Sequence, residues 1–187
     1  MTLMILLSAS SVSATNFSGA TGATGCPMSD NNMADNRDHY FWYDSLTVNV
    51  ASAVNWSRTN NFDPTRINTF YDSSENSTTD AIVRDQDYTT YCGYTWHDSG
   101  STGGVNGLAT CNSLNGVSEC ESHVLRYDTS FFDGASLSFQ RHVACHEVGH
   151  SLGLKHRSEN GCMTSSATAY TSLTSHDNGH LNDTSNY

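Results

Sequence analysis

The sequence predicts a single α+β domain, and three observations lead to this fold class. The chain has 187 residues, enough to bury one sizeable hydrophobic core. Its apolar residues follow a helical spacing in two long stretches and form short runs between them. The predicted order is therefore helix, strands, helix. The helices lie at residues 39–60 and 137–152, and the strands at 66–71, 80–85, 89–96 and 123–127.

The first helix is predicted from the spacing of its large apolar residues. Between Tyr40 and Trp56 they recur every two to four residues, which gives one apolar face. Residues 40–43 also fit a strand, and the pattern leaves this alternative open. Residues 100–107 contain four glycines and are predicted to form a loop.

The most informative segment has the spacing H-E-x-x-H-x-x-G-x-x-H and begins at His146. On a helix, residues i and i+4 share a face, so His146 and His150 can bind the same ion. Gly153 tolerates a positive φ, so it can end the helix and bring His156 back as a third ligand. Three protein ligands leave a fourth tetrahedral position for water, as in catalytic zinc sites.

Glu147 directly follows the first predicted ligand and is placed to reach water on the metal. Zinc lowers the pKa of its water toward ~7. We expect Glu147 to take the proton of this water as it attacks a peptide carbonyl, and to pass the proton to the leaving amine. The expected cofactor is one catalytic Zn²⁺, and the expected partner is a protein or peptide substrate.

The long motif, followed by Met163, resembles the metzincin metallopeptidases, and most closely the small secreted matrixin-like enzymes of bacteria. In this family a methionine in a tight turn packs beneath the zinc-binding histidines, and Met163 stands seven residues after His156. The resemblance is strongest over residues 135–163. Two departures are Arg157 after the third histidine and Ser165 where astacins and serralysins carry a tyrosine ligand.

The resemblance implies a metzincin-like catalytic domain with a twisted mixed sheet, two main helices and a zinc cleft. It also implies that the cleft-edge strand pairs with an extended peptide substrate. The tail after Met163 would then form the wall of the pocket for the residue after the scissile bond.

The N-terminal segments predict a secreted protein. Residues 1–14 read as a signal peptide, 15–38 as a flexible arm or short pro-segment, and 39–187 as the catalytic domain. Six cysteines in this context indicate up to three disulfides. Cys145–Cys162 would join the active-site helix to the turn at Met163, and Cys111–Cys120 would close a local loop. Cys26–Cys92 then remains by elimination, with a zinc-blocking role for Cys26 as the alternative.

The formal charge of −11 argues against nucleic acids and anionic membranes as partners, because both require clustered basic residues. We expect a monomer. Calcium has no recognisable loop, although four carboxylates have suitable chemistry: Asp80, Asp85, Asp87 and Asp133. His142 is expected to be a packed or surface histidine, with a supporting role behind the metal ligands as the alternative. His176 and His180 are expected to lie in a solvated C-terminal segment, and the alternative is that one of them binds substrate or hydrogen-bonds near the metal.

Two further functions stay open beside the secreted zinc endopeptidase. One is a non-catalytic secreted binding protein on a metzincin scaffold, against which the intact Glu147 counts. The other is a zinc hydrolase acting on a different carbonyl substrate.

Overall fold

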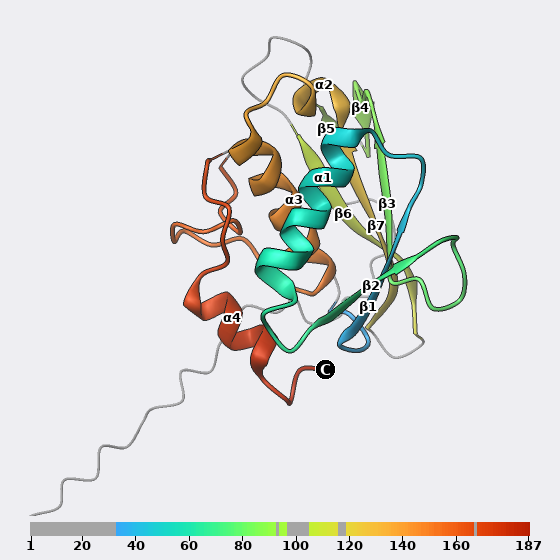
Figure 1. Ribbon diagram of the computed structural model, residues 1–187, viewed down its shortest axis with the longest axis vertical. Helices are drawn as coiled ribbons and strands as arrows, with labels where there is room; N and C mark the ends of the chain where they lie inside the picture. The colour runs from blue at the N-terminus through green and yellow to red at the C-terminus, as the bar shows by residue number, and fades with distance from the viewer. Residues whose placement is uncertain (1–32, 93, 97–104, 116–118, 167) are drawn as a thin grey trace, which may run out of the picture.

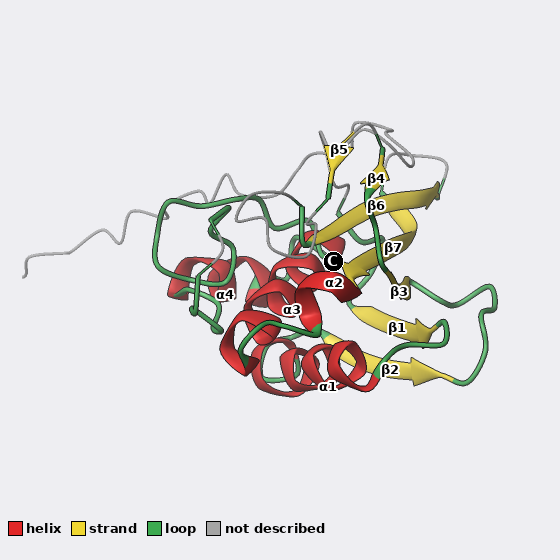
Figure 2. Cartoon of the chain, turned by 90° about the horizontal axis from the view of Figure 1, so that it is seen from above, coloured by secondary structure: helices red, strands yellow, loops and turns green. Residues whose placement is uncertain are grey.

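The structure is a computed structural model that describes residues 33–92, 94–96, 105–115, 119–166 and 168–187. A five-stranded sheet forms one layer, and the long helices α1 and α3 cover one of its faces (Figure 1, Figure 2). The strands are β1 (Asp38–Tyr43), β2 (Asn68–Asp72), β3 (Ala81–Gln86), β4 (Thr90–Tyr91), β5 (Tyr94–Thr95), β6 (Gly107–Leu114) and β7 (Cys120–Asp128). The helical elements are α1 (Val48–Ser57), the π-helical turn η1 (Arg58–Phe62), α2 (Thr129–Phe132), α3 (Leu137–Ser151) and α4 (Ser175–Asn182). The predicted α+β class with a mixed sheet and two main helices is confirmed.

The sheet has the strand order β2-β1-β3-β7-β6. The first four of these strands are parallel, and β6 runs antiparallel to β7 at the edge. Residues of β6 approach α3 directly, since a side chain at Gly107 would meet α3 side chains. The edge strand therefore borders the helix that carries the motif.

The inward face of the sheet follows from the period of two along each strand. Phe41 pairs with Ala81, Val83 with Leu125, and Leu125 with Ala109, so these residues share one face. They pack in the same buried cluster as Val50 and Val54 of α1 and Ala144 and Val148 of α3. This cluster lies between the sheet and the two helices and fixes the position of α3.

The predicted helix at residues 39–60 is wrong in its first part. Residues 38–43 form β1, with His39 and Phe41 fully buried and Tyr40 facing outward, and only residues 48–57 form α1. Ser45 has a φ of 59° and turns the chain between the two elements. The strand alternative for residues 40–43 is confirmed, because period two and period 3.6 share several positions in this short stretch.

Three other predicted elements also change. Residues 89–96 form two short strands, β4 and β5, rather than one strand. Residues 100–104 of the predicted loop lie outside the described part of the chain, and the unpredicted strand β6 begins at Gly107. The C-terminal segment is not simply solvated, since residues 175–182 form α4 and His180 is buried there.

Two predicted disulfides, Cys111–Cys120 and Cys145–Cys162, are confirmed. No cysteine among the described residues is free. Cys26 lies outside these residues, so its pairing with Cys92 stays a prediction. Within the same residues, none of the helices has the length and apolar composition needed to cross a bilayer.

Buried His39 links β1 to the end of α3. The Ser151 hydroxyl donates to the Val148 carbonyl at 2.8 Å, so it accepts from His39 Nε2 at 3.0 Å. Desolvation lowers the pKa of His39 well below its ordinary value, and His123 and Arg58 contribute in the same direction. The ring is therefore neutral in the folded protein.

This neutral ring predicts a loss of stability in acid. The pKa of His39 is lower in the folded chain than in the unfolded chain, so below about pH 6.5 the unfolded chain takes up a proton that the folded chain cannot hold. Down to the folded pKa, we expect the free energy of unfolding to fall by about 1.4 kcal/mol per pH unit more steeply in the wild type than in His39→Gln. Urea unfolding at several pH values measures both slopes, and parallel slopes would contradict this account.

Candidate active site

The helix α3 places two histidines of the motif on one face and ends where the chain must turn. After Ser151 the Leu154 N–H donates to the Gly149 carbonyl at 2.9 Å, and Gly153 adopts a φ of 88°. Only glycine enters this left-handed region without strain. The predicted turn at Gly153 is thus confirmed, and it returns the chain so that His156 faces α3.

Three imidazole nitrogens converge at this point. His146 Nε2 lies 3.0 Å from His150 Nε2 and 3.0 Å from His156 Nε2. Among the described residues, these histidines are the only group of three or more His, Cys, Asp or Glu side chains that could hold one metal ion. His150 is buried and His156 is exposed, so the cluster opens to solvent on one side.

The tautomers of two histidines follow from their second nitrogens. His146 Nδ1 lies 2.8 Å from the Cys162 carbonyl oxygen, and His150 Nδ1 lies 2.6 Å from that of Leu154. A carbonyl can only accept, so each Nδ1 donates its proton and each Nε2 presents a lone pair. Two lone pairs 3.0 Å apart cannot bond to each other, whereas a shared cation would satisfy both.

Desolvation favours the neutral form of all three rings, most strongly for the two on α3. Desolvation lowers the pKa of His146 well below its ordinary value, lowers that of His150 to about 3, and also lowers that of His156. Neighbouring imidazoles add to the shifts of His146 and His150. Neutral imidazole is the form that binds metal ions.

Glu147 follows His146 on α3 and contacts the edge strand β6. Its side chain is 5% exposed and accepts the backbone N–H of Ala109 on β6. Burial raises the pKa of Glu147 to about 8, and the hydrogen bond from Ala109 opposes this shift. A nearby cation would pull this pKa down again. A carboxyl group whose pKa lies near neutral pH can both accept and release a proton there.

The sequence predicts a loop at Gly107 and does not reveal that this glycine packs against Glu147. A Cβ at this position would lie 2.7 Å from both Cγ and Oε1 of Glu147 and 2.9 Å from Cγ1 of Val143. The absence of a side chain at Gly107 therefore leaves room for the carboxylate. The four glycines of residues 100–107 were the only sign in the sequence that this segment needs small residues. They do not indicate that Gly107 contacts Glu147.

Gly107→Ala should displace the Glu147 carboxylate without touching the histidines. A misplacement of about 1 Å in a catalytic group can cost about 100-fold in rate, so we expect a loss of that order in kcat with zinc content unchanged. Gly134→Ala is the matched control, because a Cβ there meets nothing within 4 Å. Equal kcat values for the two variants would show that Gly107 does not position Glu147.

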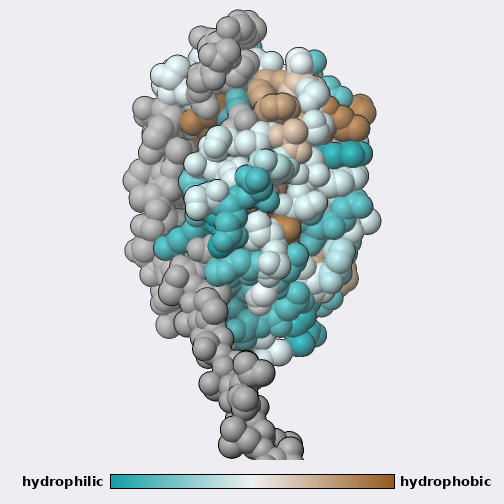
Figure 3. Space-filling view, turned by 90° about the vertical axis from the view of Figure 1, so that its left-hand side faces the viewer, coloured by the Kyte–Doolittle hydropathy of each residue, from teal (hydrophilic) through white to brown (hydrophobic). Residues whose placement is uncertain are grey.

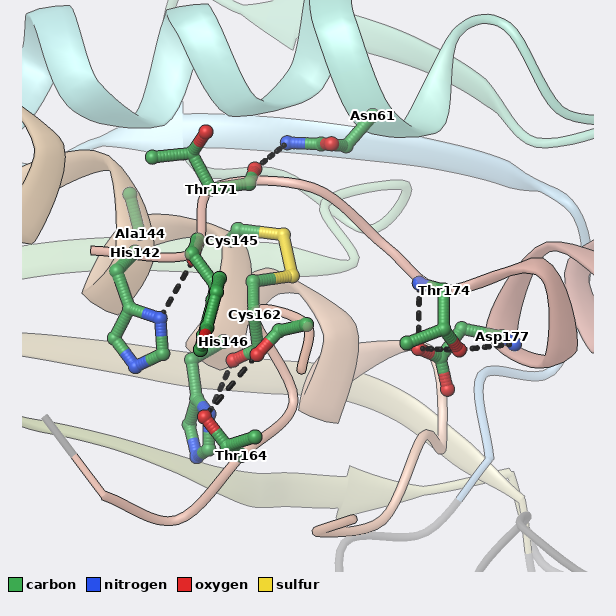
Figure 4. Close-up of a disulfide and its surroundings, with 12 residues drawn as sticks. Asn61, His142, Ala144, Cys145, His146, Cys162, Thr164, Thr171, Thr174 and Asp177 are labelled. Carbon is green, nitrogen blue, oxygen red and sulfur yellow. Dashed lines mark hydrogen bonds between the residues drawn. A yellow bond between two sulfur atoms is a disulfide. The ribbon is translucent and has the colours of Figure 1, made fainter. Parts of the chain in front are cut away.

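Met163 lies where the resemblance places it, under the helix. The residue is fully buried, and a Cβ at Gly149 would collide with its sulfur. The neighbouring Cys162 bonds to Cys145 of α3, and its carbonyl accepts from His146 (Figure 4). Gly149 is thus a second position that the sequence interpretation missed, since it allows the turn to approach the helix between His146 and His150.

The segment after Met163 is fixed to the helices by backbone carbonyls. His142 Nδ1 donates to the Tyr170 carbonyl at 2.8 Å, and Asn61 Nδ2 donates to that of Thr171 at 2.9 Å (Figure 4). The Cys162 N–H donates to the Ser172 carbonyl at 2.9 Å. His142 is buried, as predicted for a packed histidine, and it holds this segment while its ring also lies 5.9 Å from that of His146.

The carboxylates considered for calcium do not converge on a shared site. Asp80 accepts the Tyr40 N–H, and burial raises its pKa to about 7. Asp85 accepts from the backbone and hydroxyl of Thr47 at the start of α1. These hydrogen bonds join Asp80 to β1 and Asp85 to the start of α1, so both carboxylates stabilise the fold.

The sequence over residues 29–157 matches the profile of the metallo-peptidase family M12B, reprolysin-like. The chain belongs to this family. The matched range includes Glu147 and the three converging histidines, and the metzincin resemblance is confirmed at the level of the family. The matrixin-like subgroup favoured by the motif stays a prediction. By its family, this reprolysin-like chain is related to metallopeptidases, which depend on a metal ion.

Two solved structures of myroilysin are similar to this reprolysin-like chain. One shares 15% identity over 74% of the chain with a TM-score of 0.41, and the other 17% over 75% with a TM-score of 0.42. The chain spans about half of the length of these structures, 54% and 55%. None of the curated proteins matches the chain.

Proposed function

We propose that this protein is a secreted zinc endopeptidase in which His146, His150 and His156 bind the metal and Glu147 is the general base. The observation that carries this proposal is the convergence of three imidazole Nε2 atoms next to a buried carboxylate. The two disulfides and the apolar N-terminal segment support an extracellular location.

The donor set favours zinc among the common metals. Three neutral imidazoles suit zinc, whereas calcium and magnesium prefer oxygen ligands. The Nδ1 atoms of His146 and His150 donate to backbone carbonyls, which fixes both rings with their lone pairs directed at the ion. A closed structural site would need a fourth protein ligand, and the described residues offer none at the cluster.

When bound, zinc supplies Lewis-acid chemistry that polarises a substrate carbonyl and makes water more acidic. Glu147 accepts a proton from the attacking water and delivers it to the leaving amine. Ala109 orients the carboxylate through its N–H, and Gly107 leaves the room that the carboxylate needs.

The edge strand β6 is the proposed partner of an extended peptide. It is the last strand of the sheet and lies beside Glu147, so a peptide paired with it would pass the histidine cluster. The segment fixed by His142 and Asn61 is the proposed wall of the pocket for the residue after the scissile bond.

A digestion of an unfolded protein tests the proposed activity. We expect the mature chain loaded with one equivalent of zinc to cleave internal peptide bonds, to stop when a chelator removes the metal, and to recover when zinc is restored. Products would be identified by mass spectrometry. Zinc-loaded protein that leaves a broad set of unfolded proteins and peptides intact would contradict the proposal and favour a binding role.

A further inference from the structure

A second pair of histidines lies on α4, outside the site described above. His176 and His180 are four residues apart on this helix, and their Nε2 atoms are 3.1 Å apart. Their ring centroids are separated by 4.8 Å. For His146 and His150 the same two distances are 3.0 Å and 4.5 Å. Two helices of the protein thus present imidazole pairs of nearly the same geometry.

The two rings on α4 are preorganised by the helix. Residues i and i+4 are neighbours on one helix face. A capping box starts the helix here, in which Asp177 N–H donates to the Thr174 hydroxyl at 3.2 Å and Thr174 N–H donates to the Asp177 carboxylate at 3.0 Å. A ligand that bridges the two rings therefore loses little conformational entropy on binding.

His176 is half-buried and His180 is 2% exposed, so the ring of His176 is the more accessible of the two. The side of the molecule on which α4 lies in Figure 1 is mostly hydrophilic (Figure 3). A polar ligand fits this surface better than an apolar one. Paired imidazole nitrogens favour zinc, copper and nickel over calcium and magnesium, which prefer oxygen.

We infer that His176 and His180 form a second binding site, one for a divalent transition metal such as zinc. No third His, Cys, Asp or Glu ligand atom lies close enough to the pair within the described residues. Water fills the remaining positions, so the site binds its ion more weakly than the three-histidine cluster does.

An ion at this site would also act on the segment that carries His156. Asp177, between the two histidines, is fully buried, and its Oδ1 lies 3.7 Å from Nη1 of Arg157, the residue after His156. A metal that holds α4 in its helical form keeps Asp177 in place against Arg157. The second ion therefore stabilises the folded protein in addition to the first.

Equilibrium dialysis against increasing Zn²⁺ tests the inference, starting from protein that already carries one equivalent and at a pH above the ordinary pKa of histidine. Bound zinc is measured by atomic absorption, and the melting temperature in parallel. We expect the wild type to reach two ions per chain, with a rise of a few degrees as the second binds. His176→Asn should stop at one ion and show no such rise.

His176 is the preferred position because it is only half-buried, and His180→Asn is the second variant. Asn178→Ala, on the same helix, is the control that should still bind two ions. The count of two ions rests on the proposed zinc at the three-histidine cluster, whereas the difference between the wild type and His176→Asn tests the α4 pair by itself. The inference is overturned if His176→Asn binds as many zinc ions as the wild type and binds them as tightly.

Discussion

Glu147→Gln is expected to abolish most peptide cleavage while the protein keeps its zinc. Glutamine has nearly the shape of glutamate, so it still fits beside Gly107, but it cannot accept a proton from water. General acid–base catalysis contributes about 10²–10⁴-fold, and we expect kcat to fall within that range. Because Glu147 is not one of the three side chains that converge as candidate ligands, the zinc content should stay at one per chain.

The control for this variant is Glu75→Gln, which makes the same change at an exposed position. Rates would be measured on one fluorogenic peptide with the zinc content determined for each preparation. If Glu147→Gln kept the wild-type kcat, another group would have to move the proton. If the variant lost its zinc, Glu147 would belong to the metal site instead.

His156→Ala is expected to weaken zinc binding by about 100-fold or more. Loss of a hydrogen bond behind a ligand already costs about 10–100-fold in affinity, and here a ligand itself disappears. His156 is exposed, so the fold should tolerate the change. Competition with a chromophoric chelator measures the affinity.

Lys155→Ala is the matched control, since this exposed neighbour has no ligand chemistry near neutral pH. It should bind zinc as the wild type does. An unchanged affinity in His156→Ala would remove His156 from the ligand set and leave only the pair on α3.

The histidines were predictable because their spacing reports local geometry. Four residues separate His146 from His150 on one helix face, and Gly153 marks the turn that returns His156. The helix spacing and the turn both depend on residues that are close in sequence, so the sequence alone could predict the cluster. The structure brings the same three histidines together. The disulfide between Cys145 and Cys162 follows in a similar way from their positions beside His146 and Met163.

Contacts between distant segments could not be predicted. Gly107 and Glu147 meet across the fold, and only the position of β6 in the sheet brings them together. The register of β6 depends on its pairing with β7, which a single sequence does not reveal. The false helix over β1 has a local origin, since its short apolar pattern fits both the helical and the strand period. His39 is buried because it meets Ser151 of α3, and the local pattern contains no sign of this contact.

Zinc-edge X-ray absorption on protein carrying one zinc per chain would test the central claim most directly. Three histidines and one open position predict about three nitrogen neighbours and one oxygen neighbour, all near 2.0–2.2 Å, with no sulfur. This result would support a catalytic zinc site formed by His146, His150 and His156. A sulfur neighbour at about 2.3 Å, or a shell of four protein ligands without an open position, would contradict it.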